Sequence, residues 1–125
     1  MSWATFEHIL QGLRAWRSEG NPVKVIYLHG IGEPLTNPQI VDMIHIIKKE
    51  QLCREVRLVT NGSLLTPQLN QRLIDAGVYM LRVSIEAFTV VGYQELCGIN
   101  IDFSLIVEHI RDFTREAVVL KAKCL

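Results

Sequence analysis

Polar and glycine residues gather in three short groups, each at the end of a short apolar, β-branched segment. The groups are residues 29–35, residues 60–62 and residues 84–86. In parallel α/β folds, binding and catalytic groups collect at the carboxyl ends of the strands. We therefore expect the three groups to lie close together and to share one site.

The first group combines a pair of glycines with an acidic residue. Gly30 and Gly32 allow the backbone to approach a ligand closely. A dinucleotide phosphate loop is excluded, because the third glycine position holds Leu35 and the carboxylate of Glu33 would repel a phosphate. An acidic turn rich in carbonyl groups suits a cation such as an ammonium group. A connecting turn without a ligand is the alternative.

The third group places a hydroxyl and a carboxylate two residues apart. On a strand, Ser84 and Glu86 would point to the same face, where they could bind a sugar diol. A pair of solvated residues on a sheet edge is the alternative. The second group contains Asn61 and Gly62, which are common turn residues and by themselves indicate little.

Helix-forming and strand-forming segments alternate along the chain. Apolar residues recur with helical period in residues 4–18, 38–50, 67–76 and 103–115. Short β-branched runs predict strands at residues 23–29, 55–61, 79–86 and 117–125. Thr66 followed by Pro67 marks a helix start and Gly77 a helix end. The alternation requires a parallel sheet within one domain over residues 1–125.

Each predicted strand has one nearly apolar face and one mixed face. On residues 55–61, Val56 and Leu58 alternate with Arg57, Val59 and Asn61. Both faces of a doubly wound sheet lie under helices and would be apolar. The pattern instead predicts an α/β fold that is a four-stranded slice of a partial (βα)6 TIM-like barrel, with helices on one face and a functional lumen on the other. An ordinary open α/β sheet is the alternative.

In this order and spacing, the segments resemble the middle of a radical S-adenosylmethionine (radical SAM) enzyme. The resemblance rests on Gly30-Ile31-Gly32-Glu33-Pro34-Leu35, on Thr60-Asn61-Gly62 with Leu65-Thr66, on Leu73-Ile74-Asp75-Ala76-Gly77-Val78 and on Val83-Ser84-Ile85-Glu86. It implies that the first turn, which is similar to the GGEP motif, receives the methionine amino group of S-adenosylmethionine. It further implies ribose contacts from the third group and a pocket-rim position for Asn61. The cofactor-binding residues expected from it are Gly30, Ile31, Gly32, Glu33, Pro34, Asn61, Ser84 and Glu86.

The resemblance also implies a reaction, and this sequence departs from the family in one respect. In the family, a [4Fe–4S] cluster donates an electron to S-adenosylmethionine, and the resulting 5′-deoxyadenosyl radical abstracts hydrogen from a substrate. The Cys-x3-Cys-x2-Cys cluster motif would precede residue 1, and Cys53, Cys97 and Cys124 lack that spacing. We therefore expect a fragment without the first strand, its cluster loop and the last strand. We expect it to be inactive alone, with no catalytic residue, no metal ligand and no bound cluster. The substrate is not specified.

Two other functions fit parts of the pattern. Lys121 and Lys123 on the last predicted strand would suit a Schiff-base aldolase barrel, although solvated lysines are the simpler interpretation. A truncated homologue acting as a non-catalytic binding or assembly module is the third hypothesis. His29 ends a strand, but a packed or hydrogen-bonded histidine is more usual there than a ligand.

Composition narrows the class of protein. Apolar residues make up 49% and charged residues 21% of the 125 residues, and the formal net charge is +0. This balance suits a globular core and indicates neither nucleic acid nor an anionic membrane surface as partner. No apolar run approaches the ~20 residues of a membrane span. Three scattered cysteines indicate reduced thiols in a cytoplasmic protein.

We predict that the isolated chain is a homo-oligomer, most simply a two-fold dimer. A slice of a barrel has two open sheet edges, which tend to pair with other chains. The side chains of Tyr27, Val59 and Val119 on the mixed face would add exposed apolar surface. Light scattering at micromolar concentration tests this prediction. A monomer of 14.2 kDa that unfolds cooperatively would contradict the barrel-slice interpretation.

Overall fold

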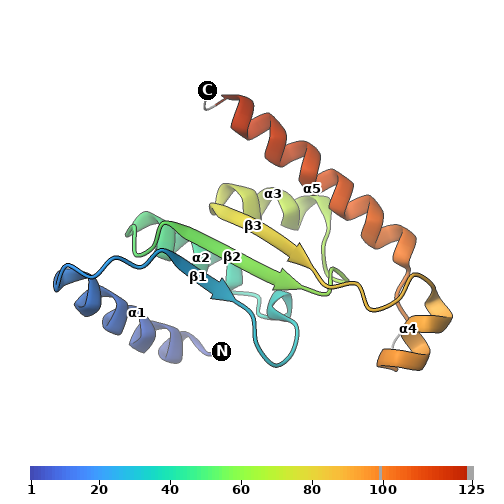
Figure 1. Ribbon diagram of the computed structural model, residues 1–125, viewed down its shortest axis with the longest axis horizontal. Coiled ribbons are helices and arrows are strands. Elements are labelled where there is room, and N and C mark those ends of the chain that lie inside the picture. The colour runs from blue at the N-terminus through green and yellow to red at the C-terminus, as the bar shows by residue number, and fades with distance from the viewer. Residues whose placement is uncertain (99, 124–125) are drawn as a thin grey trace.

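The chain folds into a parallel sheet with helices packed on one side (Figure 1). The computed structural model describes the backbone of residues 1–98 and 100–123, and the side chains of these residues up to 117. The elements in chain order are α1 (Trp3–Ser18), β1 (Val25–Leu28), the 3₁₀ turn η1 (Pro34–Thr36), α2 (Ile40–Lys49), β2 (Glu55–Thr60), α3 (Pro67–Asp75), β3 (Val78–Val83), α4 (Val90–Cys97) and α5 (Phe103–Lys123).

The strands lie in the order β1-β2-β3, and both neighbouring pairs are parallel. Leu28 pairs with Leu58, and Val59 pairs with Arg82. A register shift between Val56 and Arg57 inserts an extra residue on β3. The predicted parallel sheet is therefore confirmed for three strands, although β1 begins two residues later than predicted and β3 ends three residues earlier.

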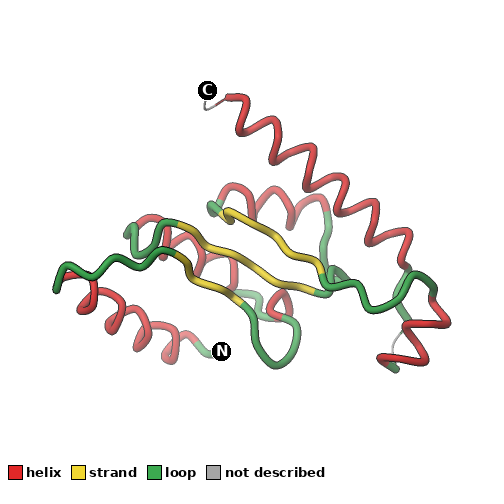
Figure 2. The backbone as a smooth tube through the Cα atoms, in the orientation of Figure 1, coloured by secondary structure: helices red, strands yellow, loops and turns green. Residues whose placement is uncertain are grey.

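One face of the sheet carries the main core. Figure 2 shows the strands in front of α2 and α3, and the burial of β2 alternates accordingly: Val56, Leu58 and Thr60 are buried. The helices contribute Phe6, Leu10, Met43, Ile44, Ile47 and Leu73 to the same cluster. Burial of apolar surface stabilises a fold by about 25 cal/mol per Å². This cluster is the larger of two among the described residues, and it therefore contributes more to stability than the smaller one. The smaller cluster is formed by Tyr93 of α4, Ile106 of α5 and Ile101 in the segment between these helices.

The helix boundaries follow the capping residues that the sequence contains. The hydroxyl of Ser2 accepts a hydrogen bond from the Thr5 N–H at the start of α1, and the hydroxyl of Thr66 does the same for Leu69 in α3. After α3, Gly77 adopts φ +91°, which only glycine tolerates at low cost. The predicted start and end of this helix are therefore confirmed.

The prediction of a fourth strand at residues 117–125 is wrong. Residues 117–123 continue helix α5, and residues 124 and 125 lie outside the described part of the chain. No glycine or proline occurs between Phe103 and Lys123, so nothing ends the helix there. The lysines at 121 and 123 are thus on helical backbone, which removes the strand that the aldolase hypothesis required.

Helix α4 is absent from the sequence-based prediction. Its residues Val90, Val91 and Gly92 are poor helix formers, and only Tyr93 is buried, so no apolar stripe marks it. The signals that do mark it are its ends. The Thr89 hydroxyl accepts from the Gly92 N–H, and Gly98 ends the helix with φ +68°. Among the described residues, no helix is both long enough and apolar enough to cross a membrane.

We predict that Gly62→Ala strongly destabilises the fold. Gly62 has φ +79°, and a Cβ there would lie 2.9 Å from Val83 Cγ1 and 3.1 Å from Ile106 Cγ2. The left-handed backbone costs about 1–2 kcal/mol for a residue with a Cβ, and the contacts add a packing penalty of about 1–3 kcal/mol. Chemical denaturation should report the sum as a fall in the free energy of unfolding.

Gly20→Ala is the matched control. Gly20 has φ +84° but no atom within 4 Å of its Cβ position. The Gly20→Ala variant should therefore be destabilised only by the unfavourable backbone conformation and not by steric contacts. Equal losses in the two variants would show that the close approach of Gly62 to β3 and α5 contributes nothing.

Candidate functional site

A cavity of about 330 Å³ lies where the three strands end. Most of the predicted site residues line it, together with three that were not predicted. Its lining is His29, Gly30, Gly32, Glu33, Pro34, Val59, Thr60, Asn61 and Ser84. The groups that follow β1, β2 and β3 are therefore brought together, as their strand-end positions predict.

The carboxylate of Glu33 connects the first turn to the end of β2. Its Oε1 accepts hydrogen bonds from the Leu35 N–H at 3.0 Å and from the Thr60 hydroxyl at 2.6 Å. Its Oε2 accepts from the Asn61 N–H at 2.7 Å. Hydrogen bonds to an ionised acceptor are stronger than neutral ones. Glu33 therefore fixes the glycine-rich turn against the neighbouring strand.

Thr60 extends this network to β3. Its side chain is buried, and its Oγ1 accepts from the Gly62 N–H at 3.0 Å while donating to Glu33. Its carbonyl oxygen accepts from the Ser84 N–H at 2.8 Å. One threonine thus joins the ends of all three strands, so the cavity wall is held by defined bonds.

Asn61 shapes the second turn through its own side chain. Its Oδ1 accepts from the Ser63 N–H at 2.9 Å and from the Ser63 hydroxyl at 2.7 Å. This is the side-chain turn that Asn commonly forms. The amide group therefore lies at the cavity wall with its oxygen already used within the turn.

Two of the predicted residues do not line this cavity. Ile31 is fully exposed at the tip of the turn, and Glu86 is exposed beyond the end of β3. Because β3 ends at Val83, strand alternation does not apply to Glu86. Its N–H donates to the Tyr93 hydroxyl at 3.3 Å, which holds the backbone of the third group near α4.

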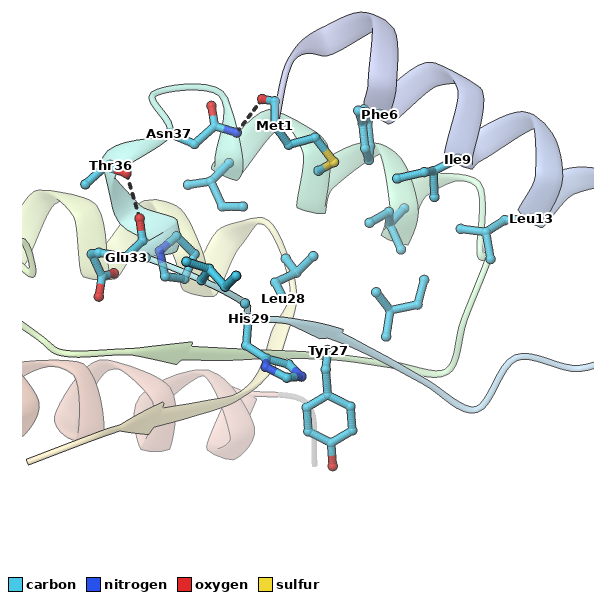
Figure 3. Close-up of a pocket in the computed structure, with 17 residues that line it drawn as sticks. Met1, Phe6, Ile9, Leu13, Tyr27, Leu28, His29, Glu33, Thr36 and Asn37 are labelled. Atoms are coloured by element: carbon cyan, nitrogen blue, oxygen red, sulfur yellow. Dashed lines mark hydrogen bonds between the residues drawn. The ribbon is translucent and has the colours of Figure 1, made fainter.

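A second cavity, of about 470 Å³, lies between α1, β1 and the first turn. Figure 3 shows Phe6, Ile9 and Leu13 on its helix side, whereas Tyr27 and His29 project from the opposite side of β1. Its wall is mainly apolar. The two cavities share His29, Gly30, Gly32, Glu33 and Pro34, and the smaller one is lined by groups from the ends of all three strands.

The open face of the sheet carries a cluster of polar and aromatic side chains that was not predicted. Arg57 donates from Nε and Nη2 to Glu55 Oε2 at 3.0 and 2.6 Å, and from Nη1 to the Tyr27 hydroxyl at 2.9 Å. Its guanidinium carbon lies 5.6 Å from the ring centre of Tyr27 and 5.8 Å from that of Tyr79. The hydrogen bonds to Glu55 and then to Tyr27 raise the pKa of Arg57 above its ordinary value.

The described residues contain no group of three or more His, Cys, Asp or Glu side chains that could hold a metal ion. Cys53 is a buried free thiol, and burial raises its pKa. Cys97 is an exposed free thiol on α4. Cys124 lies outside the described residues.

Three lining residues escaped prediction for different reasons. Thr60 was visible in the Thr-Asn-Gly turn, but its bond to Glu33 joins residues 27 positions apart, for which the sequence carries no local signal. Val59 is apolar and lies on the mixed face, so its type gave no indication of a site. His29 was noted only as a strand-end histidine.

Comparisons with known proteins agree with the arrangement of these segments. The family model described as "Radical SAM superfamily" matches residues 1–119. A GTP 3',8-cyclase of Staphylococcus saprophyticus is 30% identical over 106 residues, covering 85% of this chain and 30% of the relative.

Two further relatives match over shorter stretches. An AdoMet-dependent heme synthase of Methanosarcina barkeri is 42% identical over 69 residues, covering 55% of this chain and 18% of the relative. A tungsten-containing aldehyde ferredoxin oxidoreductase cofactor-modifying protein of Pyrococcus furiosus is 36% identical over 64 residues, covering 51% of this chain and 17% of the relative. The chain thus spans less than a third of the length of these relatives.

We predict that Glu33→Gln destabilises the fold by about 1–3 kcal/mol, because a neutral amide cannot accept from all three donors. The cost arises at the N–H groups of Leu35 and Asn61 and at the Thr60 hydroxyl. Amide hydrogen exchange should rise at residues 61 and 62 before it rises in the core. Glu95→Gln, on an exposed residue of α4, is the control and should change little. Equal effects of the two substitutions would contradict the role of the Glu33 carboxylate.

Proposed function

The chain belongs to the radical SAM superfamily, and we propose that its strand-end cavity is part of a site for S-adenosylmethionine. The observation that carries the proposal is the convergence of Gly30, Gly32, Asn61 and Ser84 on one cavity of about 330 Å³. These residues come from the ends of three different strands. The AdoMet dependence in the name of the Methanosarcina relative supports the same cofactor.

The residues present fit the polar parts of S-adenosylmethionine. The first turn is exposed at residues 30–32, and a Cβ built on Gly30 or Gly32 would meet no atom within 4 Å. The backbone there is consequently open to a ligand, and we propose that it receives the methionine amino group. Glu33 orders this turn through its bonds to Thr60 and Asn61, and Ile31 and Pro34 complete it.

We propose that Ser84 and Glu86 bind the ribose hydroxyls. Ser84 lines the cavity, and its backbone is fixed by the bond to Thr60. The backbone of Glu86 is held by Tyr93, and its side chain is exposed two residues after Ser84. A hydroxyl and a carboxylate offer complementary donors and acceptors for a diol. Asn61 would form the rim between this part and the first turn.

When bound, S-adenosylmethionine supplies the precursor of a 5′-deoxyadenosyl radical for hydrogen abstraction. This chain's residues would orient the nucleoside and amino-acid parts and exclude water around them. The described residues do not fit a [4Fe–4S] cluster, since they lack a group of three ligands. We therefore propose that this chain forms the cofactor-binding part of a radical SAM enzyme and does not by itself complete the reaction.

We also propose that the sheet is a slice of a partial (βα)6 barrel formed by residues 1–125. Helices cover one face, whereas the other presents Arg57, Val59 and Arg82, as expected for a lumen. The free thiols of Cys53 and Cys97 support a reducing compartment such as the cytoplasm.

We predict weak but specific binding of S-adenosylhomocysteine, measured by calorimetry on the full chain. Glu86→Ala and Ser84→Ala should each reduce the affinity by about tenfold, because a hydrogen bond to a charged or polar ligand group contributes about 1.5 kcal/mol. Glu95→Ala on α4 is the matched carboxylate control. Affinity that is insensitive to both substitutions would locate the ligand elsewhere, and absence of binding would contradict the proposed function.

A further inference from the structure

Two basic side chains flank Val59 on the open face of the sheet. Val59 on β2 pairs with Arg82 on β3. On the other side, Leu28 pairs with Leu58, so the next residue, His29, lies beside Val59, and both line the same cavity. Neighbouring strands are about 4.8 Å apart, so the two basic residues start from backbones about 10 Å apart.

Both basic side chains belong to the face that no described helix covers. Tyr27 and His29 project from the same side of β1 (Figure 3), and their rings meet edge to face with centroids 6.0 Å apart. Arg57 hydrogen bonds to the Tyr27 hydroxyl, which assigns it to this face as well. Val59 and its partner Arg82 follow by strand alternation.

Two acidic groups near this place, Glu33 and Glu55, are already hydrogen bonded, whereas Glu86 after β3 is exposed. Both oxygens of Glu33 accept hydrogen bonds from its own turn and from the end of β2. Glu55 is paired with Arg57 further down the face. Within the described residues, Arg82 forms no ion pair and His29 forms no hydrogen bond through its ring, and both side chains are exposed. Thr60, which donates to the Glu33 carboxylate, lies on the helix-covered face of β2, opposite to Val59. On the open face, the Arg82 guanidinium is therefore a cation for which an anion would be the partner.

We propose that His29 and Arg82 form a cradle over Val59 that binds an anionic group, a carboxylate or a phosphate, of the substrate. The inference rests on the proposed function, because it makes the cradle the substrate side of the cavity that receives S-adenosylmethionine. Val59 supplies an apolar floor that lowers the local dielectric constant, and a guanidinium can hold either anion through two parallel hydrogen bonds. The Tyr27 ring limits the orientations of the imidazole.

The charged and titratable groups around the cradle come from all three strands and from the segments that follow them. They are Tyr27 on β1, Glu55 and Arg57 on β2, Arg82 on β3, Glu33 in the turn after β1 and Glu86 after β3. Sulfate and acetate are both ionised at neutral pH, so they are suitable probes for the phosphate and carboxylate alternatives.

The test is a titration of the full chain with sodium sulfate and, separately, with sodium acetate, followed by NMR at constant ionic strength. The resonances of the His29 ring and the Arg82 guanidinium should shift saturably. Arg82→Gln should weaken the binding at least about threefold, the effect of one exposed ion pair. His29→Asn should also weaken the binding, because it removes the second basic side chain of the cradle. The matched controls are Arg72→Gln on α3 and His45→Asn on α2, both at exposed residues. They should leave the affinities for sulfate and acetate unchanged.

The outcomes separate the cradle from the cofactor site. Tighter binding of sulfate would assign a phosphate to the substrate, and tighter binding of acetate a carboxylate. Shifts that do not saturate, or that Arg72→Gln reduces as much as Arg82→Gln, would overturn the cradle. If S-adenosylhomocysteine binds to the same samples while neither anion does, only the cradle fails. If the anions bind and S-adenosylhomocysteine does not, the proposed function fails, and the assignment of the anion to a substrate fails with it.

Discussion

The carboxylate of Glu33 is the constraint on which the site depends. It receives three hydrogen bonds, two of which join the turn after β1 to the end of β2, and the Thr60 carbonyl extends the connection to β3 by accepting from the Ser84 N–H. A turn with two glycines would otherwise sample many conformations. The bonds to Glu33 therefore allow a flexible sequence to form a fixed cavity wall, with the glycine backbone left open toward the ligand.

The sequence was sufficient for the parts of the site that depend on strand direction. Parallel strands end at one edge, so the groups at Gly30, Asn61 and Ser84 had to converge, and they line one cavity. The hydrogen bonds from Thr60 and Asn61 to Glu33 could not be predicted, because these two partners lie 27 and 28 residues away. The exposed position of Glu86 depends on β3 ending at Val83, and strand ends are less strongly encoded than strand existence.

The segment after residue 116 illustrates a different limit. Val118 and Val119 favour a strand, whereas Ala117, Leu120 and Lys121 are good helix formers. A strand needs a neighbour to satisfy its backbone, while a helix satisfies its own. Residues 117–123 follow Phe103–Glu116 without a helix-ending residue, and α5 simply continues through them. The strand and helix preferences of this segment are similar in strength, and the helix that precedes it decides between them. A short window of sequence does not contain that information.

The two ends of the open face differ in how far their polar groups are satisfied. At the amino end, Glu55 and Tyr27 hold the Arg57 guanidinium, and Tyr79 adds a second aromatic ring. This end is internally complete and needs no ligand. At the carboxyl end, His29 lines the cavity and Arg82 is exposed on the neighbouring strand. Within the described part of the chain, neither side chain has a hydrogen-bond or ion-pair partner. This end of the open face is therefore the one where a ligand would add contacts, and it is also the end where the glycine turn is open.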